Sequence, residues 1–85
     1  MDDQFERGLK PIRDLLESEV RQKRFRSVAV SHTLHGSPPC PVTFKVAADG
    51  KTSEQKFTRE EIEDSAGSIE HSAHYKVSQL MERFK

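Results

Sequence analysis

Residues 42–57 read VTFKVAADGKTSEQKF, and this stretch decides the fold. In its first half, apolar side chains alternate with polar or small ones, a period of two that is typical of a half-buried β-strand. Asp49 and Gly50 form a dipeptide that favours two-residue hairpin turns. Such a turn returns residues 51–57 as an antiparallel strand, with Phe57 opposite Val42. The returning strand is otherwise polar, so we expect it at a sheet edge.

A second alternation precedes this hairpin. Val28, Val30, His32 and Leu34 alternate with Ser27, Ala29, Ser31 and Thr33, which predicts another half-buried strand. The connecting residues 36–41 read GSPPCP, and three prolines exclude a ladder strand there. The three predicted strands therefore form an antiparallel meander.

An amphipathic helix is predicted before the strands. Its apolar residues recur at spacings of three and four (Phe5, Leu9, Ile12, Leu16 and Val20). Gly8 and Pro11 interrupt the pattern, and proline suits the first turn of a helix but not its interior. We therefore expect the regular helix to begin around residues 8–11; a kink at that point is the alternative.

Two helices are predicted after the strands. Thr58 and Glu61 have the spacing of a capping box, and Phe57 and Ile62 flank them as a hydrophobic staple. A short helix should therefore begin at Thr58 and end near Gly67. Ser68 is the expected cap of a final helix. Its apolar stripe is Ile69, Ala73, Val77, Leu80 and Phe84, with Met81 at the edge.

The predicted fold is α+β, in the order α-β-β-β-α-α, as one domain over residues 1–85. Helices should cover one face of the sheet, formed by Val28, Val30, Leu34, Val42, Phe44, Val46 and Phe57. The opposite face should hold Ala29, Ser31, Thr33, Thr43, Lys45 and Ala47. This second face is small, nearly neutral and rich in hydroxyl groups, so it is a candidate partner surface.

Composition restricts the class of protein. The 85 residues carry 14 basic and 14 acidic side chains, and this balance argues against strong overall steering toward nucleic acid or an anionic membrane. The single cysteine, Cys40, cannot form an intramolecular disulfide, which favours a reducing compartment. The acidic start Met1–Asp3 does not resemble a signal peptide, and no apolar run approaches the ~18–20 residues of a membrane span. We expect a soluble cytoplasmic protein with no membrane contact.

The sequence predicts neither catalysis nor a cofactor. It contains no nucleophile elbow and no glycine-rich phosphate loop, and Cys40 has no sequence-local cation to lower the pKa of its thiol. His32 and His35 lie near Cys40, and His71 and His74 form a second pair that could share a helix face. No Cys-x-x-Cys or carboxylate–histidine pattern supports a metal site, so we expect solvated or partly buried histidines instead.

A basic run is the candidate for nucleic-acid binding. It comprises Arg21, Lys23, Arg24 and Arg26, with Phe25 interleaved. These cations could contact phosphates while the ring stacks on a base. The alternative is structural: cations at a helix C-terminus and a packed Phe25. The element order is similar to that of double-stranded-RNA-binding domains, whose last helix opens with a lysine cluster aimed at phosphates. Here the corresponding residues 59–64 read REEIED and would repel phosphates, so we do not assign the chain to that family.

Protein association is the favoured prediction. Lys51, Glu54 and Lys56 on the expected edge strand argue against strand pairing, so a face-to-face or helix-mediated contact is the better version. We therefore expect a small non-enzymatic accessory or regulatory protein that binds another protein or itself as a homodimer. The alternative is a weak nucleic-acid-binding protein that uses residues 21–26.

Overall fold

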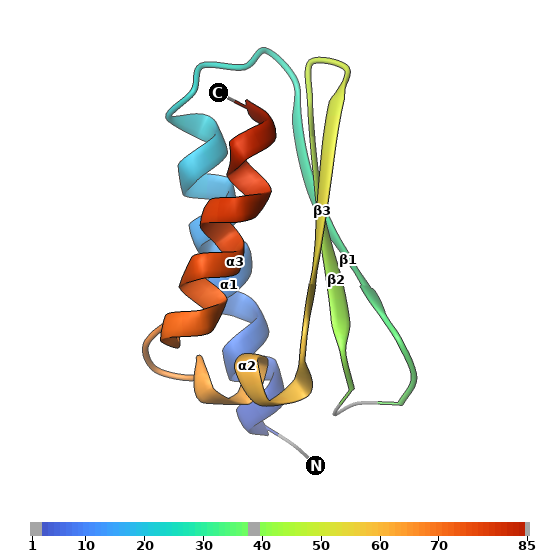
Figure 1. Ribbon diagram of the computed structural model, residues 1–85, viewed down its shortest axis with the longest axis vertical. Helices are drawn as coiled ribbons and strands as arrows, with labels where there is room; N and C mark the ends of the chain where they lie inside the picture. Colours follow the sequence, from blue (N-terminus) through green and yellow to red (C-terminus); the bar gives the residue numbers. More distant parts are fainter. Residues whose placement is uncertain (1–2, 38–39, 85) are drawn as a thin grey trace.

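A computed structural model describes residues 3–37 and 40–84. Its elements are, in order, α1 (Asp3–Arg21), β1 (Val28–Leu34), β2 (Val42–Ala48), β3 (Lys51–Phe57), α2 (Arg59–Asp64), α3 (His71–Met81) and the 3₁₀ turn η1 (Glu82–Phe84). Figure 1 shows that the helices all lie on one side of the three-stranded sheet. The predicted α+β fold and its element order are confirmed.

The sheet is an antiparallel meander in the order β1-β2-β3. Its register is one-to-one along both pairs, and Phe57 lies opposite Val42 as predicted. Asp49 and Gly50 have φ angles of 49° and 86°, the positive values that a type I′ hairpin turn requires at both central positions. Because β2 is central, β1 and β3 are both edge strands.

The core lies between β2 and the helices. All four inward residues of β2 are buried, and so are residues of α1 and α3 in the same core cluster (Phe5, Ile12, Leu16, Val20, Ala73, Val77 and Leu80). The helices reach only part of β1, where Val28 and Val30 are half-buried. Leu34 was expected on the covered face, but it is 40% exposed because the helical layer does not extend over that end of β1.

The first helix begins earlier than the sequence indicates. It starts at Asp3 and continues through Pro11, so the expected start at residues 8–11 is wrong. Two contacts account for the extra turns: Phe5 is only 1% exposed, and Gly8 packs directly on α2. Burial of these turns offsets the backbone hydrogen bond that Pro11 cannot donate.

The capping box that begins α2 is confirmed. The Glu61 N–H donates to Thr58 Oγ1 at 3.2 Å, and the Thr58 N–H donates to Glu61 Oε1 at 2.8 Å. The staple residues Phe57 and Ile62 are both fully buried. These contacts fix the angle at which the chain leaves the sheet.

The other two predicted boundaries are shifted. Helix α2 ends at Asp64, before Gly67, and α3 is capped by Glu70 instead of Ser68. The reason is the buried hydroxyl of Ser65, which donates to the Glu61 carbonyl at 2.7 Å and accepts the Glu70 N–H at 3.1 Å. This corner holds Glu70 where its carboxylate accepts the first free N–H groups of α3.

Candidate interaction surfaces

The outer face of the sheet is the surface opposite the helices. The register arranges its residues in three cross-strand rows: Ala29, Ala47 and Thr52; Ser31, Lys45 and Glu54; Thr33, Thr43 and Lys56. The β1 members of these rows are exposed, whereas Thr43 and Ala47 on the central strand are half-buried by their neighbours. The predicted partner residues Ala29, Ser31, Thr33, Thr43 and Lys45 thus share one continuous face.

Few charged side chains lie on this face. Lys45 is the only charged residue that β1 and β2 contribute, and it lies opposite Glu54 of β3. His35, just after β1, bonds through Nε2 to the Thr43 hydroxyl at 2.7 Å. The face therefore offers small groups and hydroxyls, with charge limited to Lys45 on β2 and to Glu54 and Lys56 on β3.

Sequence reasoning missed two features of the sheet. The outer face extends onto β3 through Thr52, Glu54 and Lys56, which the predicted pairing of Phe57 with Val42 already implied. The second feature is that β1 is an edge strand as well as residues 51–57, because the strand order places β2 between them. The meander itself carried that signal, because a three-stranded meander always has its first strand outside.

The basic run spans the end of α1 and the loop that follows. Arg21 lies 3.8 Å from Glu17, and Lys23 is half-buried in a hollow of about 250 Å³ that Glu19 and Glu82 also line. Arg24, with a φ of 61°, and Arg26 are exposed. Only half of the run is therefore both exposed and away from the acidic side chains around Arg21 and Lys23.

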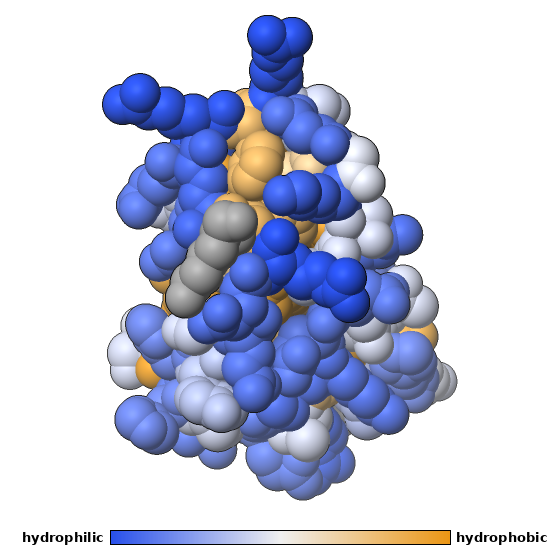
Figure 2. Space-filling model, turned by 45° about the horizontal axis from the view of Figure 1, so that its top comes forward, coloured by the Kyte–Doolittle hydropathy of each residue, from blue (hydrophilic) through white to orange (hydrophobic). Residues whose placement is uncertain are grey.

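Phe25, between these cations, is half-buried and packs against the core. Its ring meets that of Phe84 edge-on, with centroids 5.6 Å apart. Beside it, the Arg26 and Ser27 N–H groups donate to the Asp49 carboxylate at 3.1 and 2.8 Å. Figure 2 brings this end of the molecule forward and shows long hydrophilic side chains around a small apolar patch. These contacts tie the loop to the hairpin turn and to the C-terminal turn.

The histidines and the cysteine lie in separate parts of the fold, except that His71 and His74 line the same hollow on α3. The His32 ring lies 5.7 Å from that of Phe44, and His71 and His74 are exposed on α3. Cys40 is 5% exposed, and its thiol donates to the Gly36 carbonyl at 3.6 Å. Within residues 3–37 and 40–84, no three His, Cys, Asp or Glu side chains gather as a metal ion would need.

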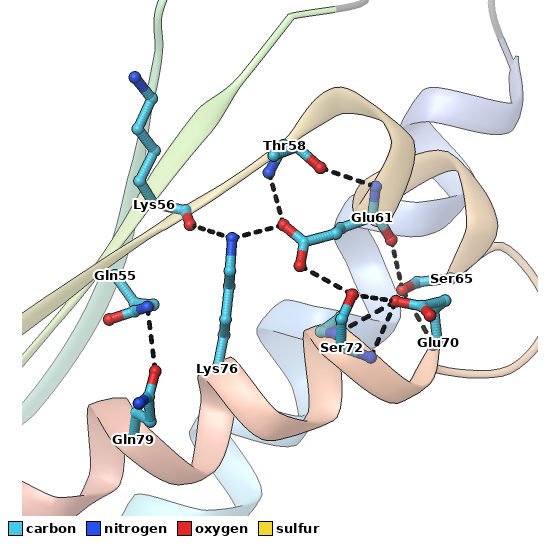
Figure 3. Close-up of polar contacts among 10 residues, drawn as sticks. Gln55, Lys56, Thr58, Glu61, Ser65, Glu70, Ser72, Lys76 and Gln79 are labelled. Atoms are coloured by element: carbon cyan, nitrogen blue, oxygen red, sulfur yellow. Dashed lines mark hydrogen bonds and ion pairs between the residues drawn. The ribbon is translucent and has the colours of Figure 1, made fainter.

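The densest polar cluster joins α2, α3 and β3 around Glu61 (Figure 3). Glu61 Oε1 accepts from the Thr58 N–H and from Lys76 Nζ, at 2.8 and 2.5 Å, and Oε2 accepts from the Ser72 hydroxyl at 2.8 Å. Lys76 also donates to the Lys56 carbonyl at 2.9 Å and lies over the Phe57 ring. Both carboxylate oxygens of Glu61 are thus engaged by groups of the fold.

The electrostatics of this cluster favour ionised carboxylates. Burial raises the pKa of Glu61, but hydrogen bonds from Lys76, Thr58 and Ser72 outweigh burial and hold the pKa below its usual value. The Ser72 hydroxyl likewise lowers the pKa of Glu70, to which it also donates. Glu61, with both carboxylate oxygens bonded by groups of the fold, is suited to joining the elements around it.

No helix among the described residues is long and apolar enough to span a bilayer. Comparison of the chain with protein-family models, with curated proteins and with solved structures finds no match.

Proposed function

We propose that this chain is a small non-enzymatic accessory or regulatory protein that acts by binding another protein through the outer face of its sheet. The supporting observation is the one-sided cover of the sheet. Helices α1 and α3 bury the inner face, while the outer residues Ala29, Ser31 and Thr33 are exposed. A sheet with one bare face needs no helix on that side to fold, so the face is free to meet a partner.

The chemistry of the face suits a protein partner. Hydroxyl groups such as Ser31, Thr33 and Thr43 can exchange water for hydrogen bonds across an interface without the desolvation penalty of ions. Ala29 and Ala47 let a partner approach the backbone closely. The charges of Lys45 on β2 and of Glu54 and Lys56 on β3 can orient the partner.

The polar clusters support a non-enzymatic role. The two carboxylates with lowered pKa values, Glu61 and Glu70, are engaged in contacts that hold α2 and α3 together. The one cysteine is buried and unpaired, which supports a reducing compartment such as the cytoplasm.

Partner capture with a blocked outer face tests the proposal. Ala47→Arg places a long cation on the central strand of the outer face, near its hairpin end, and Ser18→Arg places one on the exposed side of α1. In affinity purification from the native host, the wild type and Ser18→Arg should retain the same protein in stoichiometric amount. Ala47→Arg should retain at least about tenfold less. Equal retention by all three chains would contradict the proposal.

Weak nucleic-acid binding by Arg21, Lys23, Arg24 and Arg26 is the second candidate. The exposure of Arg24 and Arg26 supports it, while the neighbouring Glu17 and Glu19 and the packed Phe25 ring weigh against it. Replacing all four cations by glutamine should then abolish retention on nucleic acid, and binding by the wild type should weaken steeply with salt. No retention of the wild type at low salt would remove this candidate.

A further inference from the structure

The two edges of the sheet differ in how they are protected. Proteins discourage unwanted strand pairing by placing charges, prolines or bulges on edge strands. Strand β3 carries Lys51, Glu54 and Lys56. Strand β1 reads VAVSHTL, with no formally charged residue and no proline, and its register to β2 has no bulge over seven residues. Charged residues therefore protect β3 against strand pairing, whereas β1 has no such protection.

The backbone of β1 presents a regular row of groups at this edge. The His35 N–H donates to the Pro41 carbonyl, and the Asp49 N–H donates to the Ser27 carbonyl, so the odd-numbered residues of this segment bond to β2. In an antiparallel ladder the intervening residues point their N–H and C=O groups the other way. The backbone N–H and C=O groups of four β1 residues therefore point away from β2, toward the free edge (Val28, Val30, His32 and Leu34). Among the described residues, no strand other than β2 pairs with β1.

This edge is complementary to itself. We propose that β1 pairs antiparallel with β1 of a second copy of the chain, across a two-fold axis that passes beside Ser31. This register sets Val28 opposite Leu34 of the second copy and Val30 opposite His32. All the outward backbone groups of both strands are then paired, in about eight hydrogen bonds. The result is a six-stranded sheet with the helices of both copies on one side.

The side chains at the edge gain cover in the same arrangement. On the helix side, Val28 and Val30 are half-buried and Leu34 is 40% exposed. Beside them lies a hollow of about 330 Å³ between α1 and β1, lined by Leu9 and His32 and rimmed by Glu6, Lys10 and Arg13. Pairing brings the exposed part of Leu34 against Val28 of the second copy. The rim contains both acidic and basic side chains, so the rims of two copies do not repel each other as two surfaces of like charge would.

On the other side, the outer faces of the two copies become continuous across Ser31. Ser31 lies opposite Ser31 of the second copy, as a non-hydrogen-bonded pair. In such a pair the two Cα atoms are only about 4.5 Å apart. A substitution at Ser31 therefore acts on the pairing while remaining exposed in the single chain.

Sedimentation velocity of the purified protein, from about 1 to 500 µM, is the first test. The wild type should show a concentration-dependent dimer. Ser31→Glu sets two like charges opposite each other and should weaken the dimer at least tenfold, although within one chain it lies opposite Lys45. Thr52→Glu, the matched change on β3, should leave the dimer unchanged. A wild type that stays monomeric, or equal effects of both substitutions, would overturn the pairing.

Engineered cysteines test the register independently. Under mild oxidation, Ser31→Cys should give a disulfide-linked dimer on a non-reducing gel, because the two sulfur atoms meet across the axis. Thr33→Cys should not, since its copies would lie roughly 13 Å apart along the strands. The buried Cys40 is present in both variants and in the wild-type control. Equal cross-linking of both variants, or none of Ser31→Cys, would overturn the register.

Failure of this pairing and failure of the proposed function are separable. The pairing is measured on the purified chain alone, whereas binding of another protein is measured by capture with Ala47→Arg. A chain that stays monomeric but captures a partner through its outer face would overturn only the pairing.

Discussion

Gly8 of α1 lies against the backbone carbonyl of Ile62 in α2, so closely that a Cβ on residue 8 would stand 1.6 Å from that oxygen. Helices α1 and α2 therefore pack with their backbones in contact at the end of the core where the chain leaves the sheet. A glycine that interrupts an apolar stripe in the sequence is, in the fold, the position that permits this contact.

Gly8→Ala should consequently destabilise the protein, because either α1 or α2 must move away. We expect a loss of about 2–4 kcal/mol in the free energy of unfolding, measured by urea denaturation. Ser18→Ala, at an exposed position of the same helix, serves as the control and should be neutral or slightly stabilising. A Gly8→Ala protein as stable as the wild type would show that the two helices do not meet at this point.

Pro11 should limit the stability of α1. It lies inside the helix, where it cannot donate to the carbonyl of Arg7. Pro11→Ala restores that hydrogen bond and should raise the free energy of unfolding by about 1–3 kcal/mol, with a higher Tm in thermal denaturation. A lower Tm would mean that the ring of Pro11, which is half-buried, contributes more through packing than its missing N–H removes.

The Glu61–Lys76 pair should make stability depend on pH. Folding lowers the pKa of Glu61 below its usual value of 4.5, so the ionised side chain stabilises the fold above that value. This contribution is lost as the pH falls through the lowered pKa. Glu61→Gln should lose about 1–3 kcal/mol at neutral pH and less in acid, so that the two unfolding curves converge.

The control for this prediction is Lys76→Met, which removes the other partner and keeps the bulk of the side chain. If the two groups act as a pair, the double variant should be less destabilised than the sum of the single variants. The pKa of Glu70 is lowered as well. The stability of the wild type and of each variant therefore also falls in acid because of Glu70, and only the difference between the proteins reports on Glu61. A constant difference between wild type and Glu61→Gln across the acid range would contradict the assignment.

Asp49 should stabilise the hairpin in two ways. Its carboxylate accepts the N–H groups of Arg26 and Ser27, and its φ of 49° is one that Asp and Asn tolerate better than most residues. Asp49→Ala should therefore cost about 1–2 kcal/mol in denaturant unfolding. Asp49→Asn keeps the turn preference and one acceptor oxygen and should cost less. If Asp49→Ala and Asp49→Asn lost the same stability, neither the turn preference nor the acceptor oxygen that Asn retains would contribute.

Sequence patterns predict those parts of the fold that depend on residues close together in the chain. The period of two over residues 42–48 and the Asp49–Gly50 turn fixed the hairpin and its register, and Thr58 with Glu61 fixed the start of α2. The errors fall where distant residues decide. The early start of α1 depends on contacts with Ile62, and the replacement of Ser68 by Glu70 as the cap depends on the buried Ser65 hydroxyl.

The candidate surfaces follow the same division. Alternation alone placed Ser31, Thr33, Thr43 and Lys45 on one side of the sheet. The incomplete cover of β1 could not be read from the sequence, because it depends on where α1 crosses the sheet. Leu34 has the pattern of a core residue and is exposed for that reason.

Residue-resolved amide hydrogen exchange on β1 tests most directly whether this edge of the sheet pairs with a second copy of the chain. The amides of Ala29, Ser31 and Thr33 face β2 and should exchange slowly at any concentration. Those of Val28, Val30, His32 and Leu34 should exchange rapidly at about 10 µM and slow markedly at about 500 µM, as a second copy pairs with them. Exchange at these four amides that is the same at both concentrations would contradict the account.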